Sequence, residues 1–392
     1  MKTSTYLIIG GGMTGAAAVE GIRSIDPQGS IVMLSAEKHL PYNRPPLSKG
    51  LWKGKPLDSI WRKISAENTE IILGRQAVEL EPDRKIVRDD QGEAYAYDKL
   101  LLATGGTPRR LPFGGDEVTY YRDLEDYRRL RSLTGPHARF GVIGGGFIGS
   151  EIAAALRMNG QKVVMLFPES GIGANIFPGD LAAFITDHFQ EQGVEVLSGL
   201  QVVNIQGVNW GAVIQTSSGQ SILVDHVVAG IGIRPNSDLA EAAGLAVENG
   251  ILVDSFLRTS APDIYAAGDV ANFFAPALER RMRVEHEDNA LQMGRTAGMN
   301  MAGASHAYTH IPLFYSDLFD LGYEAVGRLS AQMEIASEWK EPFREGTLYY
   351  LEDGRIEGVL LWNVWGQADQ ARQMIGKPYS QVHSEALHIE AG

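Results

Sequence analysis

Cysteine is entirely absent from this 392-residue sequence. The chain therefore has no disulfide, no thiolate nucleophile, no dithiol redox relay and no cysteine ligand for an iron–sulfur cluster. No apolar run reaches the about 18 residues that a membrane-spanning helix requires. The first apolar stretch, TYLIIGGGMTGAAAVEGI, is interrupted by glycines and has no cleavage-site pattern, so we interpret it as a buried strand and helix rather than a signal peptide.

Positive charge is in deficit, with 35 Lys and Arg residues against 48 Asp and Glu residues, which gives a net charge of −13. Such an acidic chain binds nucleic acid or an anionic membrane poorly, and we expect neither partner. The nine histidines show no metal-ligand spacing, and no Ser-His-Asp arrangement is evident. The composition is that of a globular enzyme of two or three domains, which we expect to be cytoplasmic.

Glycine, in contrast, is abundant and organised. The stretch VIGGGFIGSEIAAAL (142–156) contains a G-x-G-x-x-G turn between an expected strand and an expected helix. The same device occurs earlier, in LIIGGGMTGAAAV from residue 7. This turn brings a backbone close to a pyrophosphate and is typical of dinucleotide-binding βαβ units.

The two glycine motifs belong to a long internal repeat. TEIILG (69–74) corresponds to VEVLSG (194–199), and each is followed by alternating, turn-punctuated segments typical of a β-meander. Each copy ends in an apolar strand that is followed by glycines, as in YDKLLLATGG and VDHVVAGIG. The sequence therefore predicts two related Rossmann-like α/β domains in tandem, and hence two dinucleotides: FAD and NAD(P)H.

An acidic residue follows each glycine motif at the offset expected for a ribose contact. Glu37 lies 22 residues after Gly15, and Glu169 lies 20 residues after Gly149. Glu169 favours NADH over NADPH, because a carboxylate accepts ribose hydroxyls but repels a 2′-phosphate, and no arginine stands beside it. For each glutamate, a solvated loop position is the alternative.

Five further segments carry a family resemblance: LPYNRPPLSKGLW (40–52), IYAAGDVANF (264–273), VEHEDNALQMGRTAGMNM (284–301), FYSDLFDLGYEAVG (314–327) and GVLLWNVWGQADQAR (358–372). With the repeat, they resemble the apoptosis-inducing-factor and ferredoxin-reductase branch of two-dinucleotide flavoproteins. The resemblance extends to about residue 375, and the last two segments look closer to apoptosis-inducing factor. The basic surface of the mammalian factor is absent, so its nuclear role is not carried over.

The resemblance implies three domains. A discontinuous FAD domain would cover 1–110 and 232–312, an NAD domain 111–231, and a smaller α+β C-terminal domain 313–392. The last of these would consist of antiparallel strands and a final helix that cover the flavin.

The resemblance also implies a buried Lys49–Glu151 pair beside flavin N5. Lys49 would start a helix aimed at the flavin after two prolines that suppress helix until Leu47. Glu151 would lie in the first turn of its helix, where a plain interaction with the helix dipole is the alternative. The first copy has Ala17 at the matching position. Arg44 would contact FAD phosphate or ribose groups, with an exposed loop charge as the alternative for both cations.

The flavin ring would be held by further residues in the family motifs. Asp269 would accept the ribityl hydroxyl or cap a turn, and the helix starting near Glu285 would aim its amides at flavin N1 and O2. His286 would contact the flavin or donate a proton, with a structural histidine as the alternative. Tyr315 replaces the family's tryptophan and would lie against the rings unless it is a core tyrosine. Phe147 would gate the nicotinamide pocket or simply pack.

The complete set of expected cofactor-binding residues is Gly10, Gly12, Met13, Thr14, Gly15, Glu37, Arg44, Lys49, Val78, Thr104, Gly105, Asp269, Glu285, His286, Tyr315, Gly144, Gly146, Phe147, Ile148, Gly149, Glu151, Glu169 and Gly232. Of these, Lys49 and Glu151 are the expected catalytic residues.

These features predict an FAD-dependent NADH oxidoreductase, in which hydride passes from NADH to flavin N5. Without cysteine, the electrons leave the flavin directly, toward a ferredoxin or rubredoxin-type protein or another acceptor. The alternative is a slow-turnover redox sensor, like apoptosis-inducing factor, that forms a flavin–NAD charge-transfer complex and changes its dimer state. A homodimer is therefore a further expectation.

Overall fold

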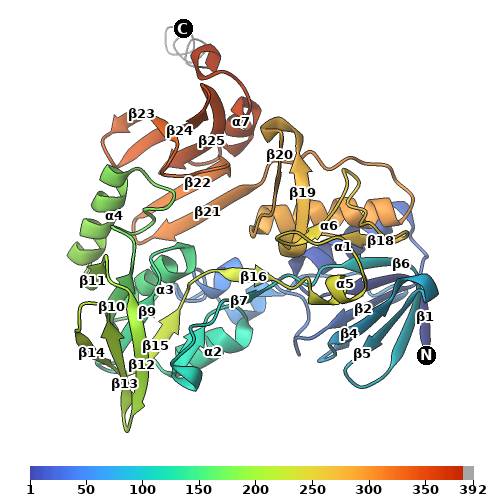
Figure 1. Cartoon of the computed structure of the whole chain (residues 1–392), viewed down its shortest axis with the longest axis horizontal. Coiled ribbons are helices and arrows are strands. Elements are labelled where there is room, and N and C mark those ends of the chain that lie inside the picture. Colours follow the sequence, from blue (N-terminus) through green and yellow to red (C-terminus); the bar gives the residue numbers. More distant parts are fainter. Residues whose placement is uncertain (383–392) are drawn as a thin grey trace. The chain divides into compact units, whose positions relative to one another are not determined.

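The computed structural model describes residues 1–382, and its chain forms two compact units (Figure 1). Unit 1 comprises Met1–Arg44, Asp58–Thr107 and Arg234–Leu313. Unit 2 comprises Pro45–Leu57, Pro108–Ile233 and the chain from Phe314 onward. The assignment of FAD-binding, NAD-binding and C-terminal domains to the ranges predicted above stays a prediction, and residues 383–392 of the last range lie outside the described residues.

The main sheet of unit 1 has the strand order β3-β2-β1-β6-β5-β4, and β18 also pairs with β6. The pairs among β1, β2, β3, β6 and β18 are parallel, whereas β4, β5 and β6 form an antiparallel meander. All five residues of β2, IVMLS, are buried, as expected for a parallel strand covered on both faces. The strands are β1 (Lys2–Ile9), β2 (Ile31–Ser35), β3 (Thr69–Leu73), β4 (Ala77–Glu81), β5 (Ile86–Asp89), β6 (Ala94–Leu102) and β18 (Ile264–Ala266).

Two helices of unit 1, α1 (Met13–Ile25) and α6 (Glu287–Met301), pack closely because glycine stands where they meet. A Cβ atom on Gly294 would lie 2.4 Å from the carbonyl oxygen of Thr14, and one on Gly298 would lie 2.1 Å from that of Ala18. Unit 1 also contains α5 (Asp238–Ala242) and a small sheet of β17 (Ile251–Leu252), β19 (Ala271–Ala275) and β20 (Arg280–Met282).

The main sheet of unit 2 repeats this topology with the order β11-β10-β9-β15-β8. Its strands are parallel, and its meander forms a separate sheet of β12, β13 and β14. The tandem Rossmann-like fold predicted from the repeat is therefore confirmed. The elements are β8 (Val118–Tyr120), β9 (Arg139–Ile143), β10 (Lys162–Phe167), β11 (Val194–Ser198), β12 (Val202–Val208), β13 (Gly211–Thr216), β14 (Ser221–Val224), β15 (His226–Ala229), α2 (Leu124–Ser132), α3 (Phe147–Met158) and α4 (Gly179–Glu191).

The C-terminal part of unit 2 is the predicted α+β structure. Its five-stranded sheet has the order β21-β22-β25-β24-β23. The pairs β22–β25, β25–β24 and β24–β23 are antiparallel. Trp362, Tyr323 and Tyr350 are its largest fully buried side chains. The elements are β21 (Leu313–Leu318), β22 (Leu321–Gly327), β23 (Glu334–Glu341), β24 (Glu345–Glu352), β25 (Arg355–Trp362) and α7 (Ala368–Met374). The short strands β7 (Gly106–Pro108) and β16 (Ile233–Pro235) pair with each other.

The segment Pro45–Leu57 folds as part of unit 2, although the chain on either side of it belongs to unit 1. Tyr121 donates its hydroxyl to the carbonyl of Leu47 at 2.5 Å, and the indole of Trp52 donates to the same carbonyl at 2.8 Å. Asn159 donates to the carbonyl of Trp52 at 3.1 Å. Residues of the range 108–233 of unit 2 thus anchor the segment that carries Lys49.

The predicted local structure of this segment was wrong in two respects. A short 3₁₀ helix spans Pro45–Leu47, so the prolines begin helical structure instead of suppressing it. Proline tolerates this position because its ring fixes φ in the helical range and the first turn of a helix needs no amide donor. Lys49 follows in a series of turns and does not start a helix.

Candidate active site

Lys49 and Glu151 form the predicted ion pair within unit 2. The Lys49 Nζ atom lies 2.6 Å from Oε1 of Glu151, and the two side chains are 13% and 4% exposed. Two serines complete the surroundings of the carboxylate: Ser316 donates to Oε1 at 2.7 Å and Ser48 donates to Oε2 at 2.5 Å. Three donors therefore compensate the burial of this charge, which an apolar site would not tolerate.

The position of Glu151 within its helix differs from the prediction. Helix α3 begins at Phe147 and has no acidic residue in its first turn, so Glu151 lies in the second turn. A helix dipole acts mainly within the first turn, so the dipole alternative is wrong for this residue. Ser48 and Ser316 were not predicted, because an isolated hydroxyl carries no charge or periodicity that would connect it to a distant carboxylate.

The second glycine loop has the geometry of an anion cradle. Gly144 has φ +110°, and a Cβ on Gly149 would lie 2.0 Å from the carbonyl oxygen of Gly144, so neither position accepts a side chain. Gly146 differs, because a Cβ there would meet nothing within 4 Å. Gly146 is also the N-cap of α3 and provides no side-chain cap, which leaves the first amides of the helix available to a phosphate.

The first glycine loop repeats these features in unit 1. Gly10 has φ +124°, and a Cβ there would lie 2.0 Å from the carbonyl oxygen of Ala103. Gly15 approaches the carbonyl of Gly10 as Gly149 approaches that of Gly144. Gly12 faces open space and caps α1 without a side-chain hydrogen bond. Met13 and Thr14 begin this helix, so the residues fit a dinucleotide phosphate in both units.

A pocket opens beside the second glycine loop, and every residue that lines it belongs to unit 2. Gly146 and Phe147 form one side, and Glu169 lies at the end of the strand that follows α3. The carboxylate of Glu169 accepts a hydrogen bond from Asn175 at 3.1 Å, so it is held in place by the loop after β10. Ile148, the second residue of α3, directly follows the glycine loop and Phe147, and its side chain is 38% exposed.

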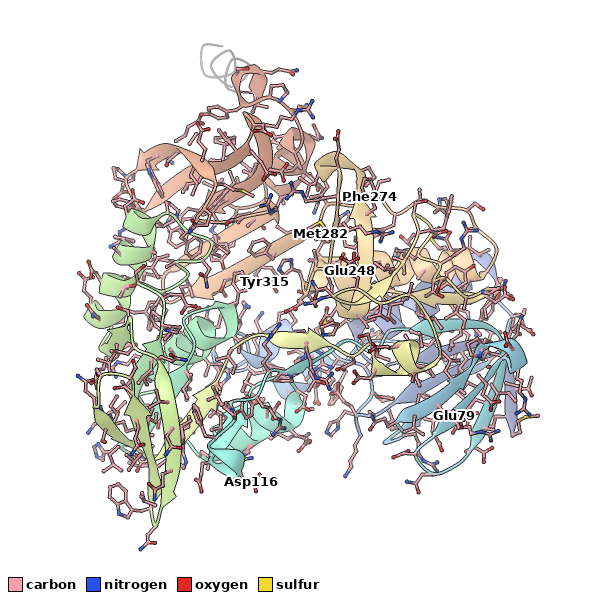
Figure 2. All side chains as sticks on the ribbon, in the orientation of Figure 1. Glu79, Asp116, Glu248, Phe274, Met282 and Tyr315 are labelled. Carbon is pink, nitrogen blue, oxygen red and sulfur yellow. The ribbon has the colours of Figure 1, made fainter. Side chains whose placement is uncertain are left out.

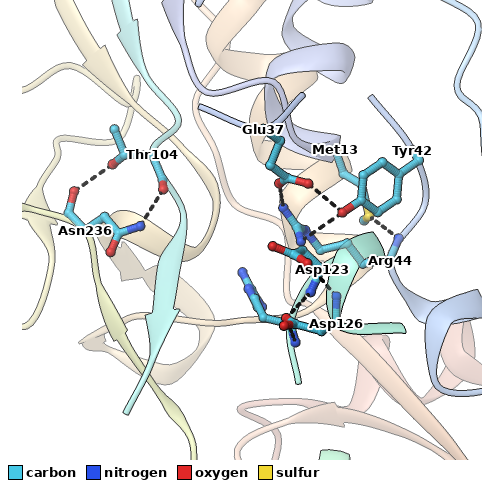
Figure 3. Close-up of polar contacts among 9 residues, drawn as sticks. Met13, Glu37, Tyr42, Arg44, Thr104, Asp123, Asp126 and Asn236 are labelled. Atoms are coloured by element: carbon cyan, nitrogen blue, oxygen red, sulfur yellow. Dashed lines mark hydrogen bonds and ion pairs between the residues drawn. The ribbon is translucent and has the colours of Figure 1, made fainter. Parts of the chain in front are cut away.

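Glu37 and Arg44 interact with each other in unit 1 (Figure 3). Glu37 also accepts the hydroxyl of Tyr42 at 2.6 Å, and the amide of Arg44 lies 3.3 Å from the sulfur of Met13. The side chains of Arg44 and Glu37 are 25% and 28% exposed. The solvated-loop alternative is therefore wrong for both residues, and the cluster places a carboxylate and a guanidinium near the start of α1.

Thr104 and Asn236 join two separate segments of unit 1 (Figure 3). Thr104 donates its hydroxyl to the carbonyl of Asn236 at 2.7 Å, and the Asn236 amide donates to the carbonyl of Thr104 at 2.9 Å. Gly105 follows with φ +67°, and Gly232 in unit 2 has φ +87°. Val78, on β4, is 54% exposed. Asn236 was not predicted.

Asp269 and His286 lie near one another in unit 1. Asp269 follows Gly268, whose φ is +77°, and its negative charge acts on both Arg44 and His286. His286 is the N-cap of α6, so the helix begins at Glu287 and not at Glu285. Burial lowers the pKa of His286 to about 4, which leaves the ring neutral at pH 7 and disfavours a role as a cationic proton donor. Glu285 pairs with Arg283 at 2.7 Å.

Two aromatic residues of unit 2 stand partly in solvent. Tyr315 on β21, labelled in Figure 2, is 38% exposed, so the core-tyrosine alternative is wrong. The Lys49 ammonium lies 5.1 Å from the centre of its ring, within the range of a cation–π interaction. Phe147 is 37% exposed and meets the ring of Phe314 edge-on at 5.4 Å, which is compatible with both gating and packing.

Two expectations concern metals and membranes. Within residues 1–382 there is no cluster of three His, Cys, Asp or Glu side chains able to hold a metal ion. In the same range, no helix combines the length and apolar character needed to cross a membrane.

Known proteins resemble this chain over nearly its whole length. It is 34% identical to the mitochondrial apoptosis-inducing factor 1 of Dictyostelium discoideum, over 95% of this chain and 78% of that protein. It is 33% identical to the ferredoxin–NAD(+) reductase component of the anthranilate 1,2-dioxygenase system of Burkholderia cepacia, over 96% of this chain and 95% of that one. The structure of a covalent putidaredoxin reductase–putidaredoxin complex matches with a TM-score of 0.90 and 30% identity, over 96% and 94% of the two chains.

Fold, glycine loops and relatives together define a flavoprotein that binds two dinucleotides, FAD and NAD(H), and acts as an FAD-dependent NAD(P)H oxidoreductase. The chain belongs to the pyridine nucleotide-disulphide oxidoreductase family, which residues 4–294 match. Residues 297–339 match the C-terminal region of mitochondrion-associated apoptosis-inducing factor. Since the chain has no cysteine, the disulfide chemistry in the family's name is excluded for its own residues.

Proposed function

We propose that this protein prefers NADH as its reductant and passes the electrons to a ferredoxin-type protein. The observation that carries the proposal is the buried Lys49–Glu151 pair beside the second glycine loop, in a chain without a cysteine to relay electrons. The Burkholderia relative is a ferredoxin–NAD(+) reductase component, and the similar putidaredoxin reductase structure is a covalent complex with putidaredoxin. Bound FAD supplies the chemistry, because it takes up a hydride from a nicotinamide and gives up electrons to an acceptor.

The first glycine loop would hold the FAD pyrophosphate with the amides at the start of α1, supported by Met13 and Thr14. Glu37 and Arg44 would bind the adenosine side, with the carboxylate accepting ribose hydroxyls. Toward the ring, Asp269 would accept a ribityl hydroxyl. The remaining proposed FAD contacts are Val78, Thr104, Gly105, Glu285, His286 and Tyr315.

The second glycine loop would hold NADH in the pocket of unit 2, with Phe147 and Ile148 at the loop, Gly232 nearby and Glu169 on the ribose. Lys49 and Glu151 would position the reacting ends of the two cofactors and keep water away from them. The paired charges suit this task, because their hydrogen-bonded surroundings hold each side chain in one orientation. We further propose a cytoplasmic location; the expected homodimer stays a prediction.

In Glu169→Ala, the ratio of the reduction efficiency with NADH to that with NADPH is expected to fall about tenfold. The reason is that the variant lacks the carboxylate that repels a 2′-phosphate. The measurement is the rate of flavin reduction, divided by the nucleotide dissociation constant, for each nucleotide in anaerobic stopped-flow experiments. Glu191→Ala is the control, since this glutamate is 73% exposed on α4 of the same unit. Equal rates with both nucleotides in the unaltered protein would show that the ribose assignment is wrong.

The proposed acceptor separates a reductase from a redox sensor. After anaerobic reduction by NADH, addition of an oxidised [2Fe–2S] ferredoxin is expected to restore the yellow colour rapidly and to support many turnovers. The sensor alternative is supported by the match to apoptosis-inducing factor. It predicts instead that the bleached colour persists in air for many minutes and that NADH changes the sedimentation coefficient. That pair of results would contradict the proposed reductase.

A further inference from the structure

Arg283 is a buried cation that directly follows β20 in unit 1. Its side chain is 8% exposed, and its guanidinium lies 2.7 Å from the carboxylate of Glu285. It also donates to the backbone carbonyl of Asp269 at 3.0 Å and to the side-chain oxygen of Asn249 at 3.3 Å. Arg283 therefore joins the turn that carries Asp269 to the residues that precede α6.

The chain leaves space for this arginine. Gly250 has φ +114°, and a Cβ there would lie 2.9 Å from Cδ of Arg283 and 2.6 Å from the carbonyl oxygen of Val270. No side chain fits at such a position without displacing the arginine or the backbone. The buried guanidinium thus occupies a place that the surrounding backbone defines.

The turn held by Arg283 lies beside the first glycine loop. A Cβ on Gly268 would lie 2.3 Å from the hydroxyl oxygen of Thr14, and the amide of Gly268 lies 3.2 Å from the sulfur of Met293. Thr14 is the second residue of α1, which the glycine loop precedes, and Met293 belongs to α6. The contacts of Arg283 are therefore made next to the loop proposed for FAD.

Carboxylates gather at the start of α6. Glu285 precedes the N-cap His286, and the negative charges of Asp269 and Asp288 both act on that histidine. Burial lowers the pKa of His286 to about 4, so its neutral ring does not offset these charges at pH 7. The guanidinium of Arg283, in contrast, stays protonated in proteins and is a permanent positive charge among these acids.

Reduction of a bound flavin adds to the negative charge of such a site. A hydride brings two electrons and one proton, so a neutral flavin ring becomes an anion when it accepts one. Where water is largely excluded, a further negative charge near carboxylates is unfavourable unless a cation compensates it.

We propose that Arg283 is a positioning residue that holds Asp269 and Glu285 in one arrangement and supplies the positive charge that favours reduction of the bound flavin. The inference rests on the proposed function, in which Asp269, Glu285 and His286 contact FAD. Arg283 acts through these residues, so its effect is on the equilibrium between oxidised and reduced flavin.

The test measures the midpoint potential of the bound flavin with a chemical reductant and a reference dye, so that NADH is not needed. In Arg283→Met, the equilibrium constant for two-electron reduction is expected to fall about tenfold, which lowers the potential by about 30 mV. The potential reports the ratio of the affinities for reduced and oxidised flavin. A purely structural defect that weakens both affinities equally therefore leaves it unchanged.

Arg281→Met is the matched control. Arg281 lies on β20 and donates to the backbone carbonyls of Val253 and Asn272 at 3.1 and 3.0 Å. Its loss disturbs the same part of the fold but leaves the guanidinium beside Asp269 and Glu285 in place. The equilibrium constant for reduction is expected to change less than about twofold in this variant.

Three further variants separate charge from position. Glu285→Gln removes a negative charge, so the equilibrium constant for reduction is expected to rise about threefold. The double variant with Arg283→Met loses one charge of each sign and should return to within about threefold of the unaltered protein. Arg283→Lys keeps the charge but lacks the guanidinium fork, so it should hold the constant within about threefold while FAD affinity falls about threefold or more.

The proposal is overturned if Arg283→Met leaves the potential unchanged, if Arg281→Met lowers it equally, or if Glu285→Gln lowers it too. Should Arg283→Met fail to fold, Glu285→Gln decides, and an unchanged potential in that variant would count against the charge role. An unaltered protein whose flavin NADH does not reduce refutes the proposed function itself. If NADH reduces the flavin and all variants share one potential, only the role of Arg283 fails.

Discussion

Lys49→Met is expected to lower the free energy of unfolding by about 3 kcal/mol, the cost typical of removing one partner of a buried ion pair. The physical reason is that the Glu151 side chain, 4% exposed, loses the ammonium group that lies 2.6 Å from its Oε1 atom, so a buried carboxylate is left without this counter-charge. Glu151→Gln should cost a similar amount, and the double variant should cost clearly less than the sum. The measurement is equilibrium unfolding by urea, with flavin absorbance and far-UV circular dichroism followed together.

The same unit offers a matched control. Lys53 and Asp317 form an ion pair at 3.2 Å, but their side chains are 43% and 36% exposed. Solvent and salt screen such a pair, so Lys53→Met and Asp317→Asn are each expected to cost less than about 1 kcal/mol. Strictly additive losses for Lys49 and Glu151, or equal losses for the two ion pairs, would contradict the assigned role of burial.

Substitutions of Gly12 and Gly146 are expected to weaken the binding of FAD and of NAD⁺ separately. Gly12→Ala should yield a folded protein that retains little FAD, with its affinity lowered about tenfold or more, because the methyl group projects into space that a pyrophosphate needs. Gly146→Ala should remain yellow but bind NAD⁺ about tenfold more weakly. Neither methyl meets protein atoms within 4 Å, so the effect is on the ligand and not on the fold. FAD content after acid precipitation, which releases a non-covalent flavin, and NAD⁺ titration measure the two affinities.

The corresponding tight positions provide the contrast. Gly10→Ala would place a Cβ 2.0 Å from the carbonyl oxygen of Ala103 at φ +124°, so it should reduce folding yield as well as FAD content. If Gly12→Ala retained FAD fully, or if Gly146→Ala lost FAD while keeping its NAD⁺ affinity, the assignment of one cofactor to each loop would be wrong.

The repeat could be predicted because it depends on local patterns. Buried strands such as IVMLS and KVVMLF are short apolar runs, and the glycines between strand and helix have no other common explanation. The pairing of Lys49 with Glu151 is different, since these residues lie 102 positions apart and only the family resemblance connected them. The partnership of Ser316 with Glu151 spans 165 positions and carries no charge pattern, so nothing in the sequence indicated it.

The errors near Lys49 and Glu151 have local causes. Two successive prolines were expected to exclude helix, but a 3₁₀ turn at Pro45–Leu47 needs no amide hydrogen from either. The start of α3 depends on where the glycine loop ends, and a shift of one or two residues moves a side chain from the first turn to the second. The local backbone geometry at the start of each helical segment therefore accounts for both errors.

The anchoring of Pro45–Leu57 has a consequence for inheritance and engineering. The two Rossmann-like modules have related strand orders, but the contacts of Pro45–Leu57 tie this segment to the second module, residues 108–233. Consider a chimaera in which only residues 108–233 are replaced by those of a relative. The carbonyls of Leu47 and Trp52 would then face the relative's residues in place of their hydrogen-bond donors Tyr121 and Asn159. A functional chimaera must therefore take Pro45–Leu57 and residues 108–233 from the same parent, although these two segments are not adjacent in the sequence.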